Sequence, residues 1–171
     1  MAAQDRDAVV NFARSLPEED LLFLSMDITQ EKVVDRWVKQ IERQRTSSIV
    51  AYLDDELVGY ANVHRNPTPW MRRVGEIRVN VGPKLRAQGL GRLLIHRIFD
   101  AARGMEVEKL IAQMTTDQTS AQNVFRKLGF VPEAVLADFV IDRDGITRDL
   151  VMMTYDVTGH TDQAGDAVRL S

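Results

Sequence analysis

The chain has 171 residues, of which 44% are hydrophobic and 27% are charged, and its formal net charge is −3. This length fits one domain with a substantial core, and the composition is that of a globular protein rather than a disordered or fibrous one. The small negative charge provides no basic field for nucleic acid or for an anionic membrane, so we expect neither as a partner. Cysteine is absent, which excludes disulfides, thiolate catalysis and cysteine metal sites.

No stretch of about 18 apolar residues is present, and the first residues do not follow the pattern of a signal peptide. The expected compartment is therefore the cytoplasm. We predict a single domain over residues 1–158. Residues 159–171 are polar without an apolar pattern, so we expect a disordered tail there.

Two amphipathic helices are predicted in the first part of the chain. Apolar residues recur at helical spacing over residues 5–16 and again over residues 31–45. Asp5 and Thr29 are the predicted N-caps of these helices, and Pro17 ends the first one.

The period then changes to that of β-strands. Residues 49–53 and 57–64 predict a β-hairpin around a polar turn, and residues 75–81 predict a third strand. Between them, residues 66–70 contain two prolines, which lack the N–H that a central strand needs, so this segment is predicted to be a loop.

The remaining elements alternate between the two periods. They are a helix to about residue 103, a strand over 110–114, a helix over 120–128 that Gly129 caps, and strands over 131–141 and 147–157 around a turn at 142–145. This order predicts an α/β (α+β) fold, in which helices cover both faces of a mixed sheet.

The segment 86–92, Arg-Ala-Gln-Gly-Leu-Gly-Arg, lies between a predicted strand and a predicted helix. Gly89 and Gly91 allow a tight turn and a close approach of backbone N–H groups to an anion at the helix start, with Arg86 and Arg92 beside them. A Walker loop is excluded because Gly91 is not followed by Lys and Ser or Thr, and a dinucleotide motif is excluded because its third glycine position is Leu94. We therefore predict a pyrophosphate site of another kind.

Two motifs resemble those of one family. Arg86, Gly89 and Gly91 fit the Arg/Gln-x-x-Gly-x-Gly/Ala signature of the GNAT superfamily of N-acetyltransferases, and residues 121–130 are similar to its Ala-x-x-Leu-Tyr-x-Lys-Leu-Gly-Phe helix. The resemblance covers about residues 49–155 and implies a strongly twisted sheet that splays open at its centre. Family members usually open with a strand before the first helix. This sequence lacks that N-terminal edge strand, so we expect the next strand to have an exposed edge and the chain to be a shortened form.

The resemblance implies acetyl-CoA as co-substrate, no metal, and direct attack of an amine on the thioester. The backbone of the third strand would polarise the thioester carbonyl, the glycine loop would hold the pyrophosphate, and Gln118 stands where many members have an asparagine that binds pantetheine. Phe125 replaces the usual tyrosine and cannot donate a proton. The residues expected to contact acetyl-CoA are Val79, Asn80, Val81, Arg86, Ala87, Gln88, Gly89, Leu90, Gly91, Arg92, Gln118, Asn123 and Phe125.

Glu76 is the candidate catalytic base, because it lies near the place where several family members have a catalytic glutamate; the alternative is a surface glutamate paired with Arg78. His64, His96 and His160 show no metal-ligand spacing, and we expect them to be solvated.

Trp70 and its polar neighbours form a candidate acceptor site. The alternatives are a dimer contact and a plain surface loop. The full set is Arg65, Asn66, Trp70, Arg72 and Arg73.

The predicted function is transfer of an acetyl group to a primary amine of a small molecule or a protein, in a monomer or a homodimer. One alternative is a catalytically weak domain that senses acetyl-CoA, and another is an interaction module that binds no coenzyme.

Overall fold

The structure is a computed structural model, and it describes residues 1–21, 24, 26–142 and 144–158. Within these residues the chain forms one six-stranded sheet with the order β1-β2-β3-β4-β6-β5. The strands are β1 Thr46–Leu53, β2 Glu56–Arg65, β3 Val74–Val81, β4 Lys109–Thr115, β5 Val131–Ile141 and β6 Thr147–Asp156. The α-helices are α1 Arg6–Ser15, α2 Glu18–Leu21, α3 Glu31–Glu42, α4 Leu90–Gly104 and α5 Thr119–Lys127. The β3–β4 pair is parallel and the other pairs are antiparallel, so the predicted mixed sheet is confirmed.

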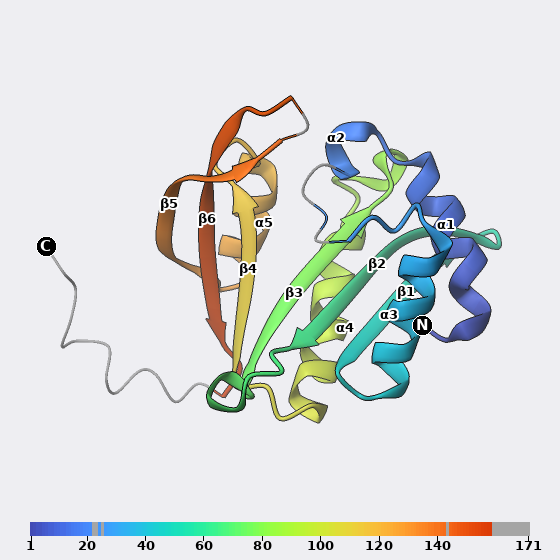
Figure 1. The fold of residues 1–171 in the computed structure, drawn as a ribbon, viewed down its shortest axis with the longest axis horizontal. Coiled ribbons are helices and arrows are strands. Elements are labelled where there is room, and N and C mark those ends of the chain that lie inside the picture. Colours follow the sequence, from blue (N-terminus) through green and yellow to red (C-terminus); the bar gives the residue numbers. More distant parts are fainter. Residues whose placement is uncertain (22–23, 25, 143, 159–171) are drawn as a thin grey trace, which may run out of the picture.

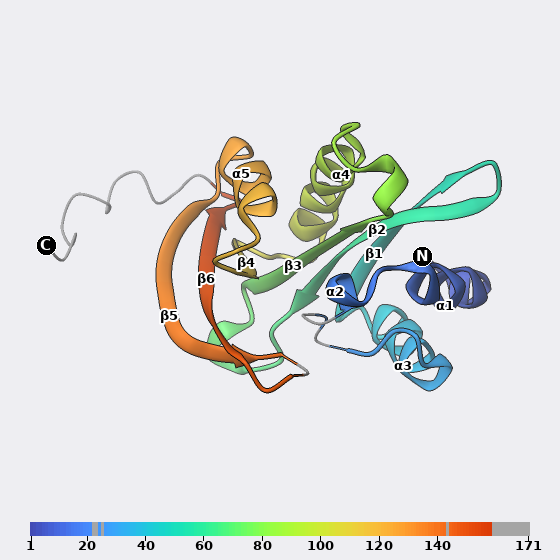
Figure 2. The ribbon, with the colours of Figure 1, turned by 90° about the horizontal axis from the view of Figure 1, so that it is seen from above.

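Helices cover both faces of the sheet (Figure 2): α4 and α5 lie on one side, and α1 and α3 lie on the other. Each side has its own hydrophobic core, because α1, α3, α4 and α5 each turn an apolar stripe toward the strands. The α4 side contains Ile95 and Ile98, and the α1/α3 side contains Trp37 and Tyr60. Burial of each such side chain stabilises the fold by about 1.5–3 kcal/mol, so the sheet is fixed from both faces.

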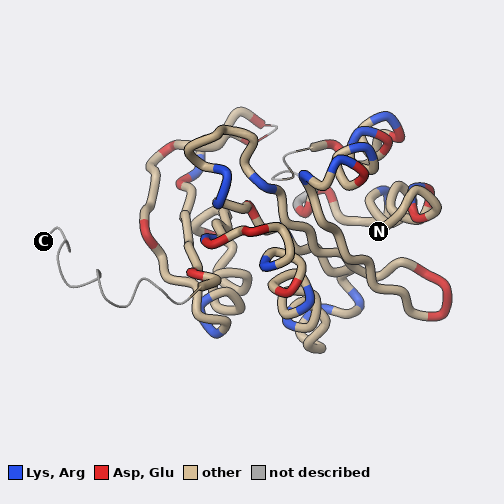
Figure 3. The backbone as a smooth tube through the Cα atoms, turned by 90° about the horizontal axis from the view of Figure 1, so that it is seen from below, with Lys and Arg blue, Asp and Glu red and all other residues tan. Residues whose placement is uncertain are grey.

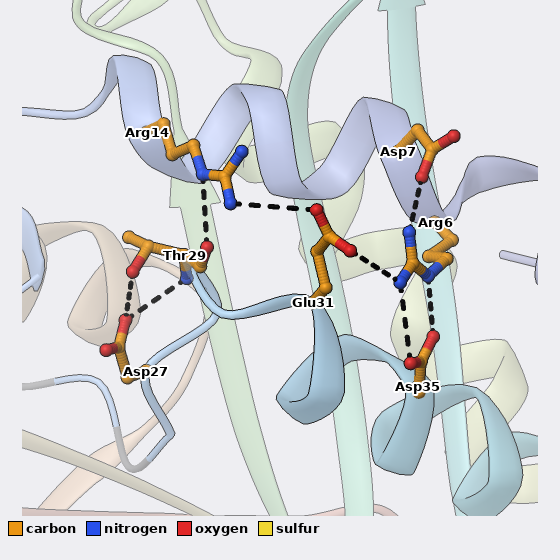
Figure 4. A network of polar contacts seen from close by, with 7 residues as sticks. All are labelled: Arg6, Asp7, Arg14, Asp27, Thr29, Glu31 and Asp35. Carbon is orange, nitrogen blue, oxygen red and sulfur yellow. Dashed lines mark hydrogen bonds and ion pairs between the residues drawn. The ribbon is translucent and has the colours of Figure 1, made fainter.

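A network of ion pairs joins α1 to α3 (Figure 4). The Arg6 guanidinium contacts Asp35 at 2.6 Å and Glu31 at 3.0 Å, and Arg14 Nε donates to the backbone oxygen of Thr29 at 3.2 Å. The hydrogen bond from Arg6 holds the pKa of Asp35 below its usual range. Because these groups are partly exposed, we expect the network to contribute little to stability although it connects the two helices.

Asp5 is the N-cap of α1 as predicted, the predicted N-cap Thr29 is wrong, and neither side chain bonds to its helix backbone. Thr29 lies before the actual N-cap of α3, which is Gln30, and the Thr29 hydroxyl donates to Asp27 instead. Asp5 does precede α1, but its carboxylate accepts hydrogen bonds from Tyr52 Oη and from the N–H of Ala2. In both places another polar partner occupies the side chain.

The second helix also ends earlier than predicted, at Glu42 rather than at residue 45. Gln44 has a φ of 56°, which is left-handed backbone that ends a helix and turns the chain into β1.

The predicted hairpin is confirmed as β1 and β2, which pair from Thr46↔His64 to Leu53↔Glu56. Its turn has left-handed backbone at Asp54 and Asp55, and the acidic tip projects from the molecule (Figure 3). Among the described residues no strand precedes α1, and β1 is an edge of the sheet as expected.

Among the described residues no helix is long and apolar enough to cross a membrane. The expected disorder of residues 159–171, and the expectation for His160, concern residues that lie outside this description.

The turn between β5 and β6 is organised by one carboxylate. Asp142 accepts hydrogen bonds from the backbone N–H groups of Ile146 at 2.9 Å and Asp144 at 3.0 Å, and it pairs with Arg148 at 3.1 Å. The Asp142 side chain is only 3% exposed. The N–H of Ile146, with Arg148 and Asp144, holds the pKa of Asp142 below its usual range.

Asp142→Asn is expected to lower the melting temperature at pH 7. Because the pKa is lower in the folded state, this stabilisation is complete above the unfolded pKa of about 3.9 and is lost as the pH falls through the folded value. The difference between wild type and variant should therefore shrink when thermal unfolding is repeated at acid pH. Asp144→Asn, at an exposed carboxylate of the same turn, is the control. A difference that stays constant with pH would contradict this account.

A buried hydrogen bond also ties α3 to β1, since Trp37 Nε1 donates to Ser48 Oγ at 2.9 Å. Ser48→Ala leaves the indole N–H without a partner, which should lower the free energy of unfolding by about 1–3 kcal/mol. Urea denaturation measures this loss. Ser47→Ala, one position away and less buried, should change stability by less than about 0.5 kcal/mol. Equal effects of the two substitutions would refute the role of the bond.

Candidate active site

The sheet opens between β3 and β4. These strands pair in parallel only from Val74↔Lys109 to Glu76↔Ile111. Beyond Glu76 they diverge as a V, which opens toward the strand ends that lead into α4 and α5 (Figure 1). The splayed centre implied by the family resemblance is therefore present, and it leaves part of the β3 backbone without a strand partner on this side.

The alternation of strand hydrogen bonds decides which β3 residues face this opening. Asn66 N donates to Val74 O at 3.0 Å, so the even-numbered residues of β3 are the ones that hydrogen-bond to β2. Val79 and Val81 consequently direct their N–H and C=O groups into the V. The backbone of Asn80 faces β2 instead, and the Asn80 side chain donates to Tyr60 Oη at 2.9 Å.

The glycine loop forms the start of α4. Gly89 is the N-cap with a φ of 87°, and the first helical bond runs from Leu93 N to Gly89 O at 3.0 Å. The N–H groups of Leu90, Gly91 and Arg92 therefore have no acceptor within the helix. A Cβ on Gly89 would meet no atom within 4 Å, so this glycine faces open space. The loop fits an anion at the positive end of the helix dipole.

The two loop arginines are in different states. Arg86 forms an ion pair with Asp20 of α2, and its Nε donates to Val81 O at 3.2 Å. Arg92 has no ion-pair partner among the residues that the structure describes. Of the two arginines, Arg92 is the one whose charge is free for an anion.

Local contacts hold the loop in shape. Ala87 has a φ of 60°, and the Gln88 side-chain amide donates to Lys84 O at 2.7 Å. The side chain of Gln88 is therefore engaged in a hydrogen bond within the loop.

A second helix start faces the first across the opening. Gln118 is the N-cap of α5, and its Oε1 accepts from Thr115 N at 3.0 Å, which leaves its NH2 group for another partner. The preceding Asp117 is tied to β6 by Arg148 at 2.8 Å. This contact fixes the loop that positions Gln118.

Phe125 is buried on α5 and packs edge-to-face on Phe130, with ring centroids 4.9 Å apart. Gly129 ends the helix as predicted, with a φ of 95° and hydrogen bonds from Gly129 N to Arg126 O and from Phe130 N to Phe125 O. The contact with Phe130 holds the ring of Phe125 in place. This ring has no hydroxyl that could donate a proton.

Two adjoining clefts occupy the V. The larger one, of about 540 Å³, lies between the starts of α4 and α5. Its predicted site residues are Val81, Arg86, Ala87, Gly89, Gly91, Arg92 and Gln118. The smaller one, of about 110 Å³, lies between β3 and β4. Its predicted site residues are Val79, Asn80, Gln118 and Phe125.

Some predicted site residues lie outside both clefts. Asn123 is exposed on α5 and lines neither cleft. Gln88 and Leu90 also line neither cleft. The loop around Trp70 lies at the closed end of the V, where β3 and β4 pair, and the Trp70 side chain is 82% exposed.

Glu76 is the last β3 residue that pairs with β4, and it forms an ion pair with Arg78. Directly opposite on β2 is His64. His64 is half-buried beside Thr46 rather than solvated as predicted, and this burial lowers its pKa. The register of the predicted hairpin was the signal that could have placed His64 next to Thr46. In the described part of the chain, no group of three or more His, Asp or Glu side chains could hold a metal ion.

Several solved structures have this fold. A GNAT-family acetyltransferase from Streptococcus pneumoniae matches with a TM-score of 0.80 at 20% identity, over 91% of this chain and 96% of that one. Ribosomal-protein-alanine N-acetyltransferase from Brucella melitensis gives 0.81 at 22% identity, over 91% and 96%. The yncA protein from Salmonella typhimurium, solved with acetyl-CoA, gives 0.80 at 19% identity, over 90% and 89%.

No curated protein sequence matches this chain. A family model does match, over residues 11–130, which span both motifs and most of the sheet. The fold, the splayed strands and this match agree, and the chain belongs to the acetyltransferase (GNAT) family.

Proposed function

We propose that this acyltransferase moves the acetyl group of acetyl-CoA directly to a primary amine of a small molecule or a protein. The observation that carries the proposal is that two groups of backbone N–H donors without a strand or helix partner lie next to each other along the V. One group is the start of α4, and the other is the backbone of Val79 and Val81 along the V. A phosphate-bearing ligand with an extended amide arm fits donors in this order.

The backbone of β3 would stabilise the charge that develops in the reaction. Bound acetyl-CoA supplies an activated thioester. The N–H of Val79 points into the V, and we assign it to the thioester oxygen. A fixed donor at such an oxygen is worth about 3–4 kcal/mol in the transition state. Leu90, Gly91 and Arg92 would hold the pyrophosphate by their backbone N–H groups.

Proton transfer would depend on Glu76. An attacking amine must be neutral, and the Glu76 carboxylate is the acidic side chain on β3 nearest the start of the V. Phe125 cannot protonate the leaving thiolate. Free thiols have a pKa of about 8.5, so the thiolate can leave near neutral pH without that help.

A direct assay tests the activity. Because the chain has no cysteine, a thiol reagent detects only the coenzyme A that is released from acetyl-CoA. The amine panel should include amino acids, polyamines and a peptide with an N-terminal alanine, since one structural neighbour is a ribosomal-protein-alanine acetyltransferase. Binding of acetyl-CoA without release for any amine would favour the alternative of a sensor, which the absence of a hydroxyl at Phe125 suggests.

Gly91→Val should weaken acetyl-CoA binding at least about tenfold, because the new side chain would occupy the larger cleft and crowd the free N–H groups. A Cβ at this position lies 3.6 Å from Val81, an ordinary contact, so the variant should fold. Titration calorimetry measures the affinity. Gly104→Val, at the far end of the same helix in open space, is the control. Unchanged affinity in a folded Gly91→Val protein would exclude the loop as the coenzyme site.

Glu76→Gln should lower kcat by about 100-fold at pH 6.5, with a smaller loss at high pH where more amine is already neutral. Acetyl-CoA affinity should not change. Arg78→Gln breaks the same ion pair but keeps the carboxylate, so it distinguishes a role of Glu76 as a base from a structural role in the ion pair. Equal losses in the two variants would show that Glu76 acts only through the ion pair.

A further inference from the structure

A separate cavity of about 510 Å³ lies on the α1/α3 face of the sheet, outside both clefts of the V. Its apolar wall includes Trp37 of α3 together with Met26 and Pro67. Trp37 is almost fully buried and its indole N–H is bonded to Ser48, so it presents carbon atoms to the cavity. The cavity therefore offers a surface for a hydrocarbon segment.

Three arginines line the same cavity: Arg36 from α3, Arg45 from the residue before β1 and Arg65 from the end of β2. None of them has an ion-pair partner among the described residues. Arg36 and Arg45 are exposed, but Arg65 is half-buried, and a guanidinium that loses water without gaining a carboxylate is costly. These groups are suited to an anion, because guanidinium groups bind carboxylate and phosphate in a bidentate manner.

A neighbouring cavity of about 310 Å³ shares Arg45 and Arg65 and adds Arg72 and Arg73, of which Arg73 is already paired with Glu108. Glu106 is the one carboxylate that lines either cavity within the described part of the chain. Since the whole chain has a net charge of −3, this concentration of arginine does not follow from a general excess of basic residues.

The cavity adjoins the proposed reaction centre. His64 lines it and stands opposite Glu76 in the β2–β3 register. Glu76 is three positions before Val79, which is about 10 Å along a strand. A ligand whose anionic group lies among the arginines can therefore extend along β3 with its other end at the start of the V.

We propose that this cavity binds the anionic group of the acceptor, so that the acceptor is a small amine with a carboxylate or phosphate several carbon atoms from its nitrogen. The inference rests on the proposed acetyl transfer. The arginines would hold the anion, Trp37 would contact the carbon chain, and the amine would face Glu76. Arg36, Arg45 and Arg65 are binding residues here and touch no reacting atom.

Calorimetry tests the site without turnover. The probes are 6-aminohexanoate against its carboxamide, and 6-aminohexyl phosphate against 6-aminohexanol, so both anions lie several carbon atoms from the amine. At least one anionic probe should bind about tenfold or more tightly than its partner without the anion, and the pair that shows the difference tells carboxylate from phosphate. Arg45→Gln and Arg65→Gln should each remove that preference and leave binding of the partner without the anion unchanged. Arg43→Gln removes an exposed charge that lines neither cavity and should preserve it.

Equal binding of the anionic probe and its partner without the anion in both pairs, or an equal effect of Arg43→Gln, would overturn the inference. The coenzyme A release assay with the same probes separates it from the proposed function. Release without any preference for the acids refutes the anion site and keeps the acetyl transfer. Acid-selective binding without release from any amine keeps the site as an anion site and refutes the acetyl transfer.

Discussion

The loss of pairing between β3 and β4 beyond Glu76 is the constraint on which the site depends. A continuous sheet would bond the backbone of Val79 and Val81 to β4 and leave no cleft. The V persists because each half has its own partner: β3 pairs with β2 up to Val81, and β4 pairs with β6 along its whole length. Unpaired strand edges are normally avoided, so an edge held open beside two helix starts favours a ligand as the missing partner.

Much of the fold could be predicted from the sequence because its signals are local. The hairpin of β1 and β2, the long helix α4 and the glycine cap at Gly129 follow from period and turn chemistry, and all three are confirmed. Asp5 is the N-cap as predicted, but its side chain does not cap the helix, for a reason that is not local. Asp5 bonds to Tyr52, which is 47 positions away, so its partner exists only once β1 lies beside α1.

The candidate site shows the same division between local and distant information. Sequence motifs located the loop at Gly89 and Gly91, but not the ion pair of Arg86 with Asp20, which joins residues 66 positions apart. The motifs also treated Val79, Asn80 and Val81 as one backbone group. In a strand, successive backbone N–H groups point to opposite sides, so the register with β2 decides which residues of β3 direct their N–H groups into the V. The backbone of Asn80 therefore bonds to β2, whereas the backbones of Val79 and Val81 face the V.

The net charge of −3 argues against nucleic acid and anionic membranes as partners, but it does not describe local sites, because it determines only the field far from the protein. At physiological ionic strength that field is screened within about 8 Å, so a chain of negative charge can still hold an anion in a local basic cavity. Arg65 lies opposite Gly75 at the start of β3, its N–H donates to the backbone oxygen of Arg45, and the start of α4 follows the last residues of β3. Two anion sites at opposite ends of one strand would bind the charged groups of two ligands far from each other. The reacting groups of both would then meet between them, along the part of β3 that β4 leaves open.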